Sequence, residues 1–310
     1  DFGRRRASDA INLNYYFSTD FSLQAVYIPF FQPANLPVGV FSSVLNPDMT
    51  LPQGMTLKAF EDKVLMPKFN LKESGKYAVK FKGSVKGIDF SVSYINGLNE
   101  LPTNTRNTIT PVDLMGGVKV SSELSFERMN IIGADAATTI GAVGVWVEGA
   151  VFTSNKSVFQ TTDLSAFYPM SPVPVTIDSF LIDKAKPAFK FIAGADYSFA
   201  NGGYVNVQYM HGFMHEKARA DLNDYFFVRY DHKFFNEKLK IAPVSGAFIV
   251  TDWSNLKENY AFAYMPQVSY MANNEVELAL STVLFGGKGN NMFAKMKDFN
   301  MLMFTMKYSF

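Results

Sequence analysis

The last nine residues of the chain, Leu302-Met303-Phe304-Thr305-Met306-Lys307-Tyr308-Ser309-Phe310, constrain its fold more than any other stretch. Apolar side chains occupy every second position from Leu302 to Phe310, and most positions between them are polar. Because successive side chains of a strand point to opposite faces, this stretch predicts a strand with one wholly apolar face. At the exposed edge of a soluble protein such a strand would promote aggregation. The pattern therefore favours a strand that closes a barrel and turns its apolar face to lipid.

An apolar residue at every second position before a terminal Phe resembles the C-terminal assembly signal of Gram-negative outer-membrane β-barrel proteins, including porins. The residues that would carry the signal in this sequence are Leu302, Phe304, Met306, Tyr308 and Phe310. The resemblance implies an all-β fold, a transmembrane antiparallel up-and-down β-barrel. It also implies a location in the bacterial outer membrane, with the barrel-assembly machinery, outer-membrane lipid and lipopolysaccharide as partners.

The composition fits such a barrel and excludes several other classes of protein. Of the 310 residues, 48% are hydrophobic and 15% aromatic, yet the mean hydropathy is only +0.01, too low for an ordinary helical membrane protein. The absence of cysteine excludes disulfides and covalently attached c-type haem within this chain. With three histidines as the nitrogen ligands at hand, we expect no metal site and no other cofactor. The net charge of +1 argues against a nucleic-acid partner.

Alternation of apolar and polar residues predicts thirteen strands, most of them 8–12 residues long. A tilted strand needs about 9–11 residues to span a membrane. The clearest hairpin turns at Lys86-Gly87. The predicted strands are Ala10–Phe17, Phe21–Phe31, Lys76–Val85, Ile88–Ile95, Val118–Ile132, Ala142–Phe152, Ala188–Phe199, Tyr204–Met210, Asp224–Phe234, Leu239–Asp252, Tyr260–Met271, Glu275–Leu284 and Leu302–Phe310.

One apolar segment, Met129 to Val151, has the length and hydropathy of a membrane-spanning helix. It contains Asp135 and Glu148, and an acid near the bilayer centre costs roughly 2.5–3.5 kcal/mol. Its glycines and β-branched residues favour two strands, and we predict a turn between them around Gly133-Ala134-Asp135.

The connections between the predicted strands alternate between short and long along the chain. Bacterial barrels have short periplasmic turns and longer extracellular loops, so this order fits one consistent orientation. Such barrels also have an even number of strands. We therefore expect at least one strand before Asp1, and fourteen or more in the complete protein, with residues Asp1–Asp9 in an extracellular loop. The alternative is that the number of hairpins predicted here is wrong by one.

Two connections are unusually long, Gln32–Gly75 and Thr153–Pro187. The first carries apolar residues that favour burial and one predicted helix, Leu57–Leu65; the second is rich in proline and is expected to be irregular. We interpret residues 1–310 as a single barrel domain in which both connections are extracellular or fold into the lumen. An outer cap that binds a partner is the alternative.

The strand register predicts which charged side chains point to the inner face. Charges inside a barrel require water or an opposite charge to solvate them, so they indicate a wet channel or a lumen bridged by ion pairs. Their signs nearly balance, which predicts weak ion selectivity. The predicted lumen-lining residues are Lys80, Lys82, Lys119, Lys190, Arg229, Lys233, Lys307, Asp89, Glu123, Glu127, Glu148, Asp196, Asp231, Glu275 and Glu277.

These observations leave three functional hypotheses. The first is a porin-like channel for passive diffusion of small solutes through a charged, loop-constricted lumen. The second is a structural sleeve that holds a protein partner, such as a surface receptor or a separate electron-transfer cytochrome. The third is a hydrolase at the barrel rim, which would depend on His211, His215 and His232. No flanking pattern supports a catalytic site, so we predict that the chain is not an enzyme.

Overall fold

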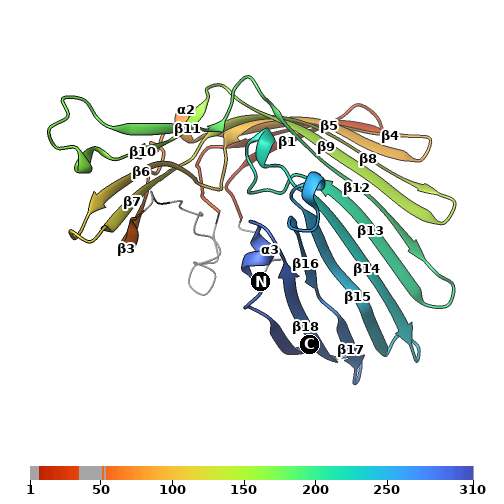
Figure 1. Cartoon of the computed structure of the whole chain (residues 1–310). Coiled ribbons are helices and arrows are strands. Elements are labelled where there is room, and N and C mark those ends of the chain that lie inside the picture. Colours follow the sequence, from red (N-terminus) through yellow and green to blue (C-terminus); the bar gives the residue numbers. More distant parts are fainter. Residues whose placement is uncertain (1–6, 35–50, 52–53, 310) are drawn as a thin grey trace.

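The computed structural model describes residues 7–34, 51 and 54–309. They form an all-β structure with one large and one small sheet (Figure 1). The large sheet has fourteen strands, and all of its pairings are antiparallel. Its strands are β1 (Ile11–Tyr16), β2 (Phe21–Ile28), β4 (Lys76–Val85), β5 (Ile88–Leu98), β8 (Arg128–Ile140), β9 (Val143–Ser154), β12 (Ala188–Ser198), β13 (Gly203–His211), β14 (Asp224–Phe234), β15 (Leu239–Val250), β16 (Tyr260–Tyr264), β17 (Gln267–Met271), β18 (Val276–Gly287) and β19 (Met301–Tyr308).

Strands β16 and β17 are two halves of one pass, because both lie between β15 and β18. Pro266 separates them and has no N–H to give to the ladder. Beside it, Pro243 lies where the β14–β15 register shifts, and its carbonyl oxygen accepts a hydrogen bond from the Tyr264 hydroxyl at 2.6 Å. Counting this broken strand once, the chain crosses the large sheet thirteen times, in the predicted up-and-down order.

The connections of the large sheet alternate in length, as predicted. Short turns join β1–β2, β4–β5, β8–β9, β12–β13, β14–β15 and β17–β18, and the longer connections lie at the opposite end. We call these ends the short-turn end and the long-connection end. Figure 1 shows the sheet curling, and the pairings leave β1 and β19 at its two edges. No pairing between β1 and β19 occurs among the described residues, so a closed barrel stays a prediction.

The small sheet is built entirely from the first three long connections. Its order is β11 (Thr176–Ile182), β10 (Val158–Asp163), β6 (Thr103–Pro111), β7 (Gly117–Ser125) and β3 (Thr56–Val64). The β10–β6 and β7–β3 pairs are parallel, and the other two are antiparallel. In Figure 1 this sheet extends to the left, away from the short turns. Its core consists of Ile109, Val118 and Val120, packed against side chains that include Phe60, Leu164 and Phe167.

Several sequence-based predictions are wrong in this region. Residues 57–65 do not form a helix, because Thr56–Val64 is strand β3. The connection Thr153–Pro187 is not irregular, since it contains the hairpin of β10 and β11. The predicted strand Val118–Ile132 is two strands, β7 in the small sheet and β8 in the large one. Residues 35–50 and 52–53 of the connection Gln32–Gly75 lie outside the described residues.

The turn predicted at Gly133-Ala134-Asp135 is also wrong. Strand β8 continues through these residues to Ile140, and the chain reverses at Gly141, whose φ of 63° favours glycine. The helices are short: α2 (Leu71–Ser74), α3 (Met292–Lys295) and the 3₁₀ turns Ser165–Phe167, Arg219–Asp221 and Trp253–Asn255. None of the helices among the described residues has the length and apolarity needed to cross a membrane.

Candidate functional site

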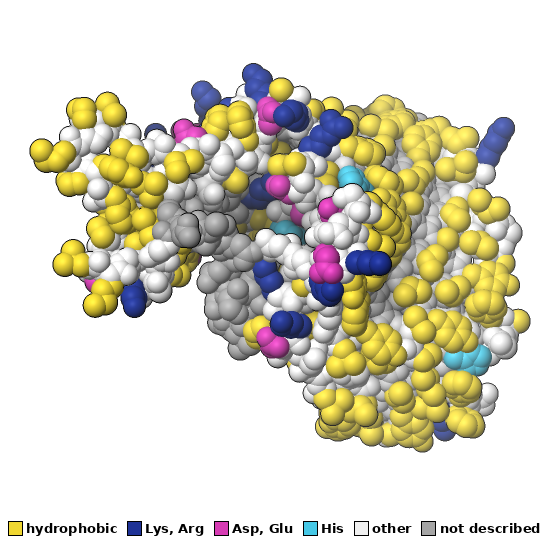
Figure 2. Space-filling view, viewed as in Figure 1, with side chains coloured by type: hydrophobic (Ala, Val, Ile, Leu, Met, Phe, Trp, Pro, Cys, Tyr) yellow, Lys and Arg dark blue, Asp and Glu magenta, His cyan; other side chains and the backbone are white. Residues whose placement is uncertain are grey.

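The two faces of the large sheet differ sharply in chemistry. One face, which we call the outer face, carries apolar side chains that remain exposed; Val207 is 46% exposed and Phe304 70%. Figure 2 shows hydrophobic side chains covering the strands on its right side, while the visible charged side chains gather near the connections and strand ends. Alternation along the strands also assigns Tyr77, Phe226, Phe262 and Leu280 to this face, where they are exposed, and Phe81 and Phe90, which are half-buried.

Aromatic side chains on the outer face gather near both ends of the strands. Near the long-connection end, Phe189 stacks on Phe191, which contacts Tyr209. At the short-turn end, Tyr197 packs edge-on against Phe199. Phe189 and Phe199 belong to one strand pass and lie ten residues apart, about 33 Å along an extended strand and about 25 Å across a membrane at the usual tilt. Two aromatic belts about 25 Å apart are typical of membrane barrels.

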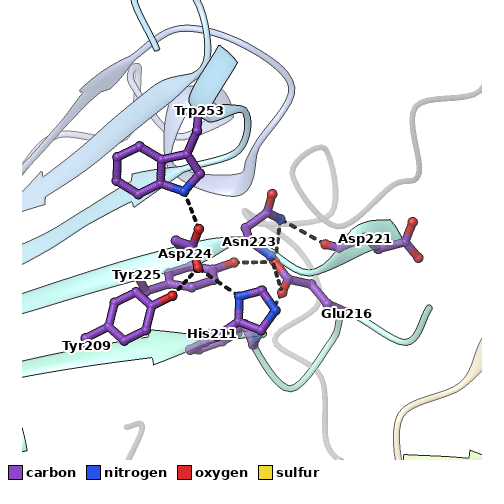
Figure 3. Close-up of polar contacts among 9 residues, drawn as sticks. Tyr209, His211, Glu216, Asp221, Asn223, Asp224, Tyr225 and Trp253 are labelled. Atoms are coloured by element: carbon purple, nitrogen blue, oxygen red, sulfur yellow. Dashed lines mark hydrogen bonds and ion pairs between the residues drawn. The ribbon is translucent and has the colours of Figure 1, made fainter. Parts of the chain in front are cut away.

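One carboxylate lies within the aromatic belt of the long-connection end. Asp224 accepts hydrogen bonds from the Tyr209 hydroxyl at 2.5 Å and from the Trp253 indole, and it lies 2.8 Å from His211 Nδ1 (Figure 3). Three polar partners therefore solvate a charge that would otherwise be costly beside an apolar surface. Tyr and Trp also anchor proteins at membrane–water interfaces, where one edge of the ring is apolar and the other wet.

The inner face, opposite the outer one, holds paired charges. Lys80 of β4 lies 3.3 Å from Asp135 of β8, which also accepts a hydrogen bond from Ser91. Arg229 of β14 lies 2.9 Å from Asp231, and Lys240 of β15 lies 3.3 Å from the other oxygen of that carboxylate. The Lys80–Asp135 pair reaches across β5, and the contacts of Asp231 join β14 to β15, so these charges of the inner face are compensated by opposite charges.

The other residues predicted to line the lumen fall into two groups. Lys82, Asp89, Glu148, Lys190, Asp196, Lys233, Glu277 and Lys307 lie on strands of the large sheet, and Glu275 lies in the turn before β18. Glu277 and Lys307 are directly opposite each other in the β18–β19 register. The prediction is wrong for Lys119 and Glu123, which belong to β7 of the small sheet, and for Glu127, which lies between β7 and β8.

The connection between β13 and β14, residues 212–223, folds over the inner face and is the feature that the sequence did not predict. Lys190 on the inner face donates hydrogen bonds to the carbonyl oxygens of Phe213 (2.6 Å) and Glu216. The Glu216 carboxylate is buried and accepts hydrogen bonds from the Tyr225 hydroxyl (2.6 Å) and the Asn223 side chain (2.5 Å) (Figure 3). It also accepts from the backbone N–H of Phe213 and Asn223. Lys190 and Tyr225 of the large sheet therefore hold residues 212–223 through Phe213 and Glu216.

Lys217 fastens the same connection to a distant part of the chain. Its ammonium donates to the carbonyl oxygens of Leu101 (2.8 Å) and Pro102 (3.1 Å) and to the Thr103 hydroxyl. Leu101 and Pro102 lie in the β5–β6 connection and Thr103 begins β6, all more than 110 positions earlier in the sequence. Burial lowers the pKa of Lys217 to about 8, because removal from water outweighs the attraction of Glu127.

The β18–β19 connection also packs on the inner face. Helix α3 contacts β16 and β18, and its Phe293 ring lies 5.9 Å from the ring of Phe285 in β18. Figure 1 shows α3 within the curve of the large sheet. An ion pair of 2.9 Å between Lys288 and Glu258 joins this connection to the preceding one. Residues 212–223 and helix α3 thus both cover the inner face at its long-connection end.

The three histidines have different partners. His211 pairs with Asp224 on the outer face, His232 lies 3.2 Å from the Tyr230 hydroxyl, and His215 is exposed beside the Phe213 ring. In the part of the chain that the structure describes, no serine hydroxyl bonds to any of them, and no cluster of three metal-ligating side chains occurs. The prediction that the chain is not an enzyme stays a prediction.

Comparison with known proteins adds no family assignment: no family model and no curated protein matches the sequence. The fold and the two faces of the large sheet therefore carry the functional argument.

Proposed function

We propose that the chain forms the wall of an outer-membrane β-barrel and acts as a porin-like channel for passive diffusion of small polar solutes. The outer face supports the membrane location, because it is apolar between two aromatic belts. The polar inner face supports a water-filled passage, because ionised groups next to hydrocarbon would be costly. In this proposal β1 and β19 gain partners and close the barrel, since an open edge cannot persist in lipid.

One observation carries the channel hypothesis: residues 212–223 lie over the inner face and are held there by Lys190 and Lys217. The tethered connection narrows the passage in the way that inward-folded loops narrow porins. It takes the place of the long connections Gln32–Gly75 and Thr153–Pro187, whose described parts supply strands of the small sheet. Their role as lumen-folded loops is therefore not part of the proposal.

Removing both tethers tests the proposal. In the double variant Lys190→Met and Lys217→Met, residues 212–223 lose their lysine hydrogen bonds, so we expect a larger single-channel conductance in planar bilayers. The barrel should survive, because wall hydrogen bonds run from strand to strand. Lys156→Met is the matched control: Lys156 also belongs to a long connection, but it is 77% exposed and its Glu127 contact is 3.9 Å. A protein that conducts no ions with or without the tethers would refute the channel.

A second candidate function is the partner-holding sleeve. Leu114 and Met115, at the turn between β6 and β7, are 107% and 95% exposed, and Met170, between β10 and β11, is 94% exposed. Fully exposed apolar side chains at the tips of adjoining hairpins are typical of binding surfaces. If the purified protein conducts nothing in the experiment above, the sleeve becomes the better hypothesis.

A further inference from the structure

A cavity of about 510 Å³ lies on the inner face near the short-turn end, between β12, β13, β14 and β15. It is far along the strands from residues 212–223, which lie at the long-connection end. Three cationic side chains line it, Arg229, Lys233 and Lys240, together with the acids Asp231 and Glu237. The cavity is open to the inner face and large enough for a small organic molecule.

Asp231 fixes the geometry of two of these cations. Its side chain is 4% exposed; one carboxylate oxygen lies 2.9 Å from Arg229 Nε and the other lies 3.3 Å from Lys240 Nζ. The shift in the β14–β15 register occurs beside Asp231, where Pro243 and Ala242 oppose a single residue of β14. Asp231 keeps its negative charge, but with both oxygens occupied it acts as a support that fixes Arg229 and Lys240 in the cavity.

The same strands place two lysines directly opposite each other. Lys233 of β14 pairs with Lys240 of β15 in the register, and like charges at opposed positions are destabilising. Each lysine has its own acid: Lys233 lies 2.8 Å from Glu237, and Lys240 contacts Asp231. Glu237 belongs to the exposed β14–β15 turn, so its compensation is weakened by solvent. An anion between the two lysines would relieve the remaining repulsion.

The cavity has free donors and few free acceptors. Arg229 uses Nε for Asp231, while its two terminal amino groups make no hydrogen bond within the described residues. The nearby Asp196 accepts a hydrogen bond from the Tyr204 hydroxyl at 3.0 Å, which reduces its ability to compete for the cations. A guanidinium held through Nε presents a planar pair of donors that matches the two oxygens of a carboxylate.

We propose that this cavity binds small organic carboxylates, with Arg229 as the bidentate anchor and Lys233 and Lys240 as secondary contacts. The inference rests on the proposed channel, in which the cavity becomes a binding station for anionic solutes leaving the passage at the short-turn end. The cavity would also give the inner face, whose charges nearly balance, a local preference for anions. The cations Arg229 and Lys240 are fixed at one site, while Asp231 is already bonded to both of them.

Calorimetric titration of the whole detergent-solubilised protein tests this site without any measurement of conductance. The probes are succinate, acetate and inorganic phosphate. We expect saturable binding of both carboxylates, stronger for succinate, because its second carboxylate can reach the lysines. Arg229→Lys keeps the charge and loses the planar pair of donors, so carboxylate affinity should fall about tenfold. Lys80→Gln, which removes an inner-face lysine outside the cavity, should change the affinity little.

A second variant guards against misfolding. Arg229→Gln combined with Asp231→Asn removes both members of the pair, so that no buried carboxylate loses its main partner, and it should abolish carboxylate binding. Unchanged binding in both Arg229 variants, or no saturable binding of any probe by the native protein, would overturn the proposal. Phosphate binding as tight as succinate binding would overturn the carboxylate assignment. Conductance that persists without anion binding would refute this site and leave the channel intact.

Discussion

Apolar and polar residues alternate along the strands of both sheets, but the two sheets differ in how far their apolar side chains are buried. In the small sheet, Val118 and Val120 are fully buried and pack against residues from neighbouring connections, including Phe60. In the large sheet, the described residues leave most of the apolar outer face uncovered, apart from contacts such as that of Trp253 with Phe226; Leu280 is 50% exposed and Phe304 70%. The small sheet thus buries a core within the protein, although side chains such as Ile177 and Phe180 remain exposed. The large sheet requires another apolar phase, which in our proposal is lipid.

The strongest test of this difference between the two sheets is to introduce a charge at an exposed apolar position of each. Val207 lies in the middle of β13 on the outer face, and Ile177 of β11 is likewise exposed, at 46% and 60% respectively. In lipid, Val207→Arg should cost about 2–4 kcal/mol and strongly reduce insertion, because arginine near the bilayer midplane loses its hydration. Ile177→Arg should have little effect, because that surface faces water.

The measurement is the folded, heat-modifiable fraction of each variant in outer membranes. Ile177→Arg is the matched control, since both substitutions replace an exposed β-branched side chain on a strand. Equal, small effects of the two substitutions would mean that the outer face does not contact lipid, and the membrane proposal would fail.

Shortening a core side chain should affect the small sheet and leave the large sheet unchanged. Val120→Ala removes two buried methyl groups from the core of the small sheet, and we expect it to destabilise that sheet by about 2 kcal/mol. The large sheet should keep its stability, since Val120 contributes nothing to it. Hydrogen exchange should show faster exchange confined to β3, β6 and β7. Val173→Ala, at an exposed position, is the control; faster exchange throughout the large sheet would mean that the two sheets form one cooperative unit.

The large sheet was largely predictable because its information is local. The alternation of residues within each strand indicates which side chains share a face, as in the hairpin of β4 and β5. Antiparallel neighbours also follow each other along the chain. The misplaced turn at Gly133 to Asp135 shows the limit of that reasoning. Asp135 signalled a turn in the sequence, but its partners Lys80 and Ser91 make it an ordinary inner-face residue. Gly141 was the residue whose conformation allows the reversal.

The small sheet was not predictable because its pairings are non-local. Strand β3 pairs in parallel with β7, and β10 pairs in parallel with β6, so neither partner lies next to it in the sequence. Apolar residues at Leu57, Phe60 and Val64 have helical spacing, but the pairing with β7 brings Phe60 to the core formed by Val118 and Val120. Tertiary contact overrides local periodicity in such a segment.

The candidate site divides in the same way. Inner-face charges such as Arg229 and Asp231 were predicted from strand register. The contact of Asp231 with Lys240 depends on a register shift that no sequence pattern predicts. The tether of residues 212–223 was missed entirely. Lys217 contacts Leu101 and Pro102 across more than 110 positions, and its short sequence neighbourhood, Met214-His215-Glu216-Lys217, has no recognisable motif.

The smallest expected effect concerns pH and sharpens the contrast between wall and connection. Burial lowers the pKa of Lys217 from 10.5 to about 8, so its ammonium loses its proton as pH rises from 7 to 9. The mouth of the passage then loses one positive charge, and ion selectivity should shift modestly towards cations. Because the unfolded chain keeps this proton up to about pH 10.5, the free energy of unfolding should rise with pH between these two pKa values.

Reversal potentials in a salt gradient measure the shift, and Lys217→Met should remove it while Lys156→Met keeps it. Exposed Lys156 is the proper control because it lies at the same end of the molecule, with no close tether. The shift should shrink between 0.1 M and 1 M salt, since the Debye length falls from about 10 Å to about 3 Å. A pH response of equal size in Lys217→Met would assign it to the charges of the wall, and the tethered connection would then have no electrostatic part in selecting ions.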